Sequence, residues 1–72
     1  MRFELLLLGR TAAGKACEAR VSVFASSQQA LHDEAHRAAE NGPWYYSDAT
    51  AAAVSEEESI TVERVKLLNK PV

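Results

Sequence analysis

Three segments of the chain carry apolar residues with a period of two, the spacing that is typical of β-strands. They span residues 2–9, 16–25 and 60–68. The first is apolar in both phases, so we expect it at the centre of a sheet. One face of this strand carries Phe3, Leu5 and Leu7, and the other face carries Glu4, Leu6 and Leu8. A short loop over residues 11–15 joins the first two segments, which should form a hairpin.

Between the second and third strands, the period changes to that of an amphipathic helix over residues 26–41. Ser26 and Gln29 have the spacing of a capping box, and Gly42 followed by Pro43 is a typical helix end. The apolar stripe consists of Leu31, Ala35, Ala38 and Ala39. Because most of these side chains are small, the stripe suits close packing on a sheet.

The predicted element order is β-β-α-β in a single small α+β domain over residues 1–72. A right-handed crossover through the helix places the third strand beside the first. We therefore predict a three-stranded antiparallel sheet of order 2-1-3 with the helix packed on one face. Ser47 could begin a short extra helical turn over residues 48–54, before the last strand, although a loop is also consistent with this stretch.

The last strand interrupts its own alternation, because Ile60 and Val62 share one phase while Val65 and Leu67 share the other. A bulge near residues 63–64 would reunite them on one face. Without a bulge, the face away from the helix would carry Leu6, Leu8, Phe24, Val65 and Leu67. Such an apolar face needs a cover. Either residues 44–54 or a second copy of the chain, in a homodimer, could supply it.

The formal net charge of −2 over 72 residues argues against nucleic acid as a partner. Cys17 is the single cysteine, so no internal disulfide can form, and we expect a reducing compartment, the cytoplasm of a bacterial host. The N-terminal leucine run is interrupted by Glu4 and ended by Arg10, which predicts neither a signal peptide nor a membrane span.

Three candidate chemical motifs are incomplete, so we expect no enzyme, catalytic residue, metal or cofactor. Residues 9–15 have the glycine and lysine spacing of a phosphate-binding loop, but Ala16 lacks the hydroxyl that binds Mg²⁺ and a strand follows. His32 and His36 have the spacing of a metal pair, but Asp33 replaces the zincin glutamate and no third ligand is indicated. Cys17 lies in the inward phase of its strand, where cysteines are usually inert.

The strongest candidate for a partner-binding surface combines aromatic and acidic residues. It consists of Trp44, Tyr45, Tyr46, Asp48, Glu56, Glu57 and Glu58. Aromatic side chains anchor protein interfaces, and acidic neighbours select a basic partner. Alternatively, Trp44 and one tyrosine pack over the helix end and complete the core. The two interpretations are compatible, because three adjacent aromatic side chains cannot all point inward.

In size and layout the chain resembles the small β-β-α-β proteins of phages and mobile elements, anti-CRISPR proteins among them. The features that carry the resemblance are the strand-to-helix junction over residues 23–31, the small single domain and the absence of catalytic motifs. The resemblance implies an inhibitor that binds a bacterial defence complex, such as a CRISPR surveillance complex, and blocks it sterically. A homodimeric structural or antitoxin-like protein is the alternative.

Overall fold

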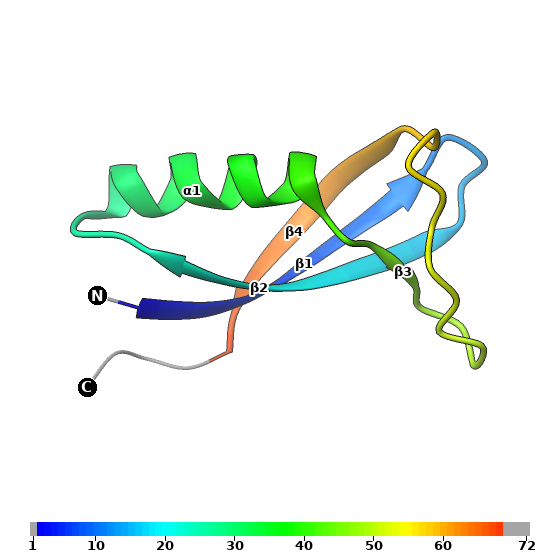
Figure 1. Ribbon diagram of the computed structural model, residues 1–72, viewed down its shortest axis with the longest axis horizontal. Coiled ribbons are helices and arrows are strands. Elements are labelled where there is room, and N and C mark those ends of the chain that lie inside the picture. The colour runs from blue at the N-terminus through cyan, green and yellow to red at the C-terminus, as the bar shows by residue number, and fades with distance from the viewer. Residues whose placement is uncertain (1, 69–72) are drawn as a thin grey trace.

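The computed structural model describes residues 2–68, which form an antiparallel sheet with one helix on one of its faces (Figure 1). The elements are β1 (Arg2–Thr11), β2 (Ala16–Phe24), α1 (Gln28–Asn41), β3 (Tyr45–Tyr46) and β4 (Ile60–Leu67). The strand order β3-β2-β1-β4 confirms the α+β class and the place of the leucine-rich strand between the hairpin partner and the last long strand.

The sheet has four strands, so the prediction of three was wrong. The additional strand, β3, pairs Tyr46 with Cys17 and Tyr45 with Glu18, at the outer side of β2. The extra helical turn is also absent: residues 47–59 form turns, and Ala53 makes an isolated bridge to Tyr45. Two residues are too few for a period of two to be recognised, which is why the sequence did not indicate β3.

Helix α1 begins one residue later than its capping signal predicted. Ser27 is the N-cap, and its Oγ accepts a hydrogen bond from the N–H of Ala30 at 3.1 Å. At the other end, Gly42 has a φ of 65° and its N–H donates to the carbonyl of Ala38, as expected of a glycine after a helix. The two adjacent serines offered alternative caps, and the structure uses the second.

The core lies between α1 and the sheet face that α1 covers, which we call the covered face. Leu5, Leu7 and Cys17 are its most fully buried large side chains. The helix contributes buried Ala35, with Leu31, Ala38 and Ala39 partly buried around it, so the predicted stripe is confirmed. Small side chains at the contact let α1 approach the sheet closely.

A bulge in β4 decides which face its apolar residues occupy. Leu8 pairs with Arg64 and Gly9 with Val62, so Glu63 is the extra residue. The bulge places Val65 opposite Leu7 and Leu67 opposite Leu5, and directly opposed residues share a face. Val65 and Leu67 therefore lie on the covered face, while Leu6, Leu8 and Phe24 lie on the opposite, open face. The predicted apolar face of five residues is thus not formed.

Gly9, beside the bulge, is required for the close approach of two neighbours. A Cβ atom at this position would lie 2.7 Å from the carbonyl oxygen of Thr61, 3.0 Å from Cγ2 of Ile60 and 3.3 Å from Cη2 of Trp44. The first contact is to backbone, which cannot yield without moving β4. The glycine that resembled part of a phosphate-binding loop therefore has a steric role.

Replacing Gly9 with alanine should destabilise the fold, by about 1–3 kcal/mol, because overpacking forces the backbone to shift. Urea denaturation followed by circular dichroism measures the change. Ala13→Ser is the control, because Ala13 is exposed in the hairpin turn and its replacement changes no core packing. Equal midpoints for the two variants would contradict the steric role of Gly9.

Candidate functional site

Trp44, which the sequence offered as a partner contact, belongs to the core. Its side chain is 6% exposed, and its Nε1–H donates to the carbonyl of Ala39 at 2.9 Å. The indole thus binds the last turn of α1 and lies over Gly9 on the covered face. Its burial agrees with the alternative interpretation, that Trp44 packs over the helix end, and leaves only a small part of the indole exposed.

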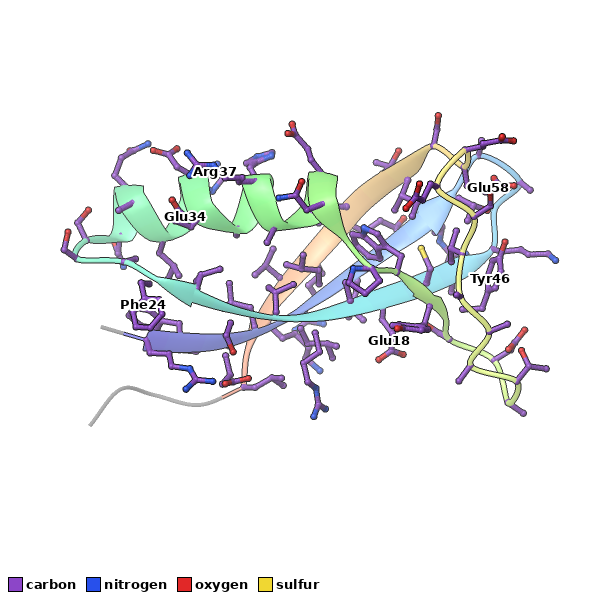
Figure 2. The ribbon with its side chains drawn as sticks, viewed as in Figure 1. Glu18, Phe24, Glu34, Arg37, Tyr46 and Glu58 are labelled. Carbon is purple, nitrogen blue, oxygen red and sulfur yellow. The ribbon has the colours of Figure 1, made fainter. Side chains whose placement is uncertain are left out.

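The two tyrosines lie on opposite faces of the sheet, because they are adjacent in β3. Tyr45 is exposed and lies opposite Glu18. Tyr46 is half-buried, and the Nζ of Lys15 lies 5.4 Å from its ring centre (Figure 2). Lys15, in the hairpin loop just before β2, therefore makes a local contact. Tyr45 is the tyrosine that remains free to contact a partner.

A groove opens beside Trp44, between the C-terminal end of α1 and the loop that precedes β4. Its volume is about 970 Å³, and it is lined by residues 39–44, 53–56, 58 and 60. Ala39, Trp44, Val54 and Ile60 supply its apolar lining. Glu40, Glu56 and Glu58 supply carboxylates, and we call this hollow the acidic groove.

The electrostatic potential of the acidic groove is negative for two independent reasons. Among the described residues, no lysine or arginine joins Glu40, Glu56 and Glu58 in its lining. The groove also lies at the C-terminal end of α1, where the helix dipole is negative and the last turn contains no basic residue. An apolar floor with a negative rim fits the aliphatic stem and cationic head of a lysine or arginine.

The structure brings together only part of the predicted aromatic–acidic surface. Glu56 and Glu58 line the groove, whereas Glu57 does not. Asp48 lies in a turn, where its carboxylate accepts hydrogen bonds from the hydroxyl and the N–H of Thr50, and these bonds lower the pKa of Asp48. Asp48 therefore stabilises the loop. Glu40 was missed, although a glutamate in the last turn of a helix opposes the dipole and was a usable signal.

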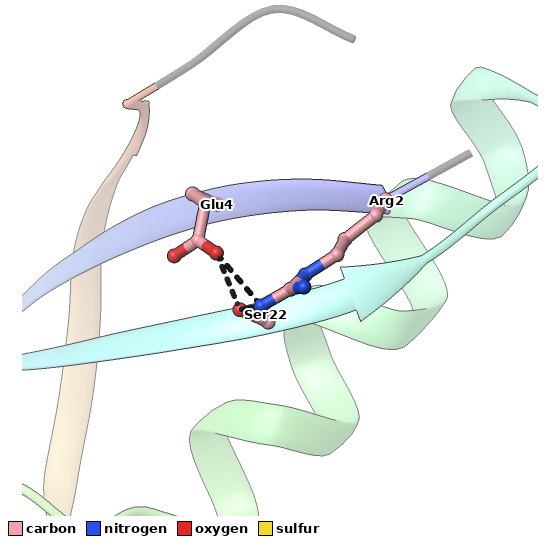
Figure 3. Close-up of polar contacts among 3 residues, drawn as sticks. All are labelled: Arg2, Glu4 and Ser22. Carbon is pink, nitrogen blue, oxygen red and sulfur yellow. Dashed lines mark hydrogen bonds and ion pairs between the residues drawn. The ribbon is translucent and has the colours of Figure 1, made fainter.

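The open face of the sheet is charged rather than apolar. Cross-strand pairing places on it Arg2, Glu4, Arg10, Glu18, Arg20, Arg64 and Lys66. Arg2 contacts Glu4 at 3.3 Å, and the hydroxyl of Ser22 donates to Glu4 at 2.8 Å (Figure 3). Leu6 and Leu8 are half-buried among these side chains. Phe24 is 72% exposed on the same face, so the predicted apolar surface there is reduced to Leu6, Leu8 and Phe24.

The candidate chemical residues Cys17, His32 and His36 do not line the acidic groove. Cys17 is buried, and burial, with the charge of Glu63 as a smaller cause, raises the pKa of its thiol. His32 and His36 are exposed, with ring centres 4.9 Å apart. Within residues 2–68 no group of three or more histidine, cysteine, aspartate or glutamate side chains could hold a metal ion. The same residues include no helix long and apolar enough to cross a membrane.

Comparison with known proteins gave no match to a family model, to a curated protein or to a solved structure.

The core role of Trp44 predicts that Trp44→Phe destabilises the fold by about 1–3 kcal/mol, because the Ala39 carbonyl loses its donor. Thermal denaturation followed by circular dichroism measures this loss. Tyr45→Phe is the control, which should change stability by less than about 0.5 kcal/mol because only an exposed hydroxyl is removed. A partner contact at Trp44 would instead leave stability unchanged in both variants.

Proposed function

We propose that this protein acts by binding another protein through the acidic groove, without catalysing a reaction. The observation that carries the proposal is the coincidence of Glu40, Glu56 and Glu58 with the negative end of α1 around an apolar floor. Like charges held close together destabilise a fold unless something else favours them. A cationic side chain from a partner would neutralise this site.

The charge of the groove indicates a basic partner surface. Its apolar lining complements the stem of an arginine or lysine, and the three carboxylates complement the cationic head group. A partner that binds nucleic acid presents such basic surfaces, because it must neutralise phosphates.

The kind of partner follows from this charge and from the resemblance in layout. An inhibitor of the anti-CRISPR type would place its acidic groove on the basic surface of a bacterial defence complex and exclude nucleic acid by occupying that surface. Binding alone is sufficient for this activity.

Glu40 offers a test in which stability and binding should change in opposite directions. Glu40→Gln removes a negative charge from the C-terminal turn of α1, which should stabilise the fold by about 0.3–1 kcal/mol. The same substitution should weaken partner capture from nuclease-treated bacterial lysate. Denaturation midpoints and quantitative capture on immobilised protein measure the two effects. Asp33→Asn, at an exposed position in the first half of the helix, is the control for a change of one charge. Unchanged capture by Glu40→Gln would count against the groove.

The two loop carboxylates provide an independent test in which the variant and its control have the same net charge. Glu56→Gln and Glu58→Gln, combined, should reduce partner capture by roughly tenfold, because desolvated charge pairs dominate such contacts. The control pair Glu57→Gln with Asp33→Asn removes the same charge outside the groove and should retain capture. Capture should also decrease with added salt. Equal losses in both pairs would show a general charge effect and contradict a specific groove.

A further inference from the structure

The two edges of the sheet differ in how they are protected. At one edge, β3 is only Tyr45–Tyr46, and the segment after it folds back, so that the N–H of Val54 donates to the carbonyl of Trp44 at 2.8 Å. At the other edge, β4 extends over Ile60–Leu67, and within the described residues no strand lies beyond it. An open edge of this length is a template for pairing with another strand.

The backbone groups that β4 presents to this open edge can be identified from its ends. The N–H of Leu68 donates to Glu4 on β1, and Ser59 accepts from Ala12. In an antiparallel ladder, the backbone N–H and C=O groups of alternate residues point to the same neighbouring strand. Since Leu68 and Ser59 point to β1, the backbone groups of Leu67 and Ile60 point away from β1, toward the open edge. With the bulge at Glu63, the outward set is Ile60, Val62, Val65 and Leu67.

The outward set is self-complementary about the middle of the strand. If a second β4 lies antiparallel with the twofold axis between Glu63 and Arg64, then Ile60 faces Leu67 and Val62 faces Val65 of the other copy. Each of these four residues then meets an outward-facing residue of the other copy, and each pair can exchange both hydrogen bonds. On the open face, Glu63 of each copy, which contacts Arg10 of its own chain at 3.1 Å, also faces Arg64 of the other copy. We propose that this protein forms a homodimer by pairing the β4 edges in this register.

Other registers lose this complementarity. An axis at Val65 would bring Arg64 opposite Lys66 of the other copy, which places like charges together. An axis at Val62 would bring Arg64 opposite Ile60, although these residues lie on different faces of the sheet. The phase change at the bulge is what makes the register about residues 63–64 consistent, because it puts all four apolar residues on the covered face.

The covered face also has room for the pairing. The side chains of Val65 and Leu67 are 47% and 46% exposed, since α1 packs mainly over β2. They line a groove of about 320 Å³ with Leu31 and Ala35 of the helix. In the dimer, Leu67 would contact Ile60 of the other copy, and Val65 would contact Val62. Both helices would lie on the same face of one continuous sheet.

The charge pair at the centre gives a test with a rescue. Arg64→Glu places Glu63 opposite a glutamate twice in each dimer, and sedimentation velocity should show dimer affinity reduced by roughly tenfold or more. Glu63→Arg combined with Arg64→Glu exchanges the charges and should restore the dimer. Concentrations from about 10 μM to about 1 mM cover weak association of this kind. Circular dichroism verifies that both variants fold.

Amide hydrogen exchange distinguishes edge pairing from other dimers. In the wild-type protein at high concentration, the amides of Ile60, Val62, Val65 and Leu67 should exchange more slowly than in dilute solution. The amides of Arg64 and Lys66 face β1 and should be protected at both concentrations, which makes them internal controls. A wild-type monomer at the highest concentration, or a double variant no better than Arg64→Glu, would overturn the proposal. Neither measurement involves the acidic groove, so the outcome for the dimer proposal is independent of the outcome for the proposed function.

Discussion

The packing of Trp44 against Gly9 is the contact on which one whole end of the molecule depends. The indole is hydrogen-bonded to the Ala39 carbonyl of α1 and lies against Gly9 of β1, where a side chain would not fit. The Thr61 carbonyl of β4 lies close to Gly9 as well, so the three elements meet at this point. The backbone of Trp44 also accepts from Val54, which fixes the start of the loop that leads to β4. The floor of the acidic groove is therefore a by-product of the core. Buried contacts fix the geometry of this floor, whereas the groove carboxylates can be replaced without altering the core.

Charge is distributed unevenly over this scaffold, and net charge alone conceals the difference. The open face of the sheet mixes arginines and lysine with glutamates, two of which pair with arginines at 3.3 and 3.1 Å. Exposed pairs of this kind contribute little stability. The carboxylates of the acidic groove have no basic neighbour in its lining and lie at the negative end of a helix. A cationic group of a partner would interact favourably both with these carboxylates and with the negative end of the helix dipole. For this reason the groove, rather than the sheet face, is the proposed binding site.

The sequence predicted the elements that are long and periodic, and it failed where a few residues depend on tertiary contacts. The hairpin, the helix stripe and the central place of β1 followed from periods of two and 3.6. Strand β3 is too short to have a period and exists because Cys17 and Glu18 offer an edge. The bulge was considered as an alternative because Ile60 and Val65 differ in phase, but only the pairing with Gly9 determines it. For Trp44 the sequence allowed two interpretations, a partner contact or packing over the helix end. Only the hydrogen bond from its indole to the Ala39 carbonyl distinguishes them.

If β4 pairs with a second copy as proposed, its phase change is also a property of that interface. Val65 and Leu67 remain nearly half exposed even after the bulge has turned them toward the helix side. What the bulge achieves is a strand whose two halves mirror each other in backbone direction, apolar side chains and charge. A twofold axis through its centre would be perpendicular to the sheet, so both acidic grooves would open on the same face of the dimer. Two copies of a weak cation site could then act together on one partner, with an avidity that neither has alone.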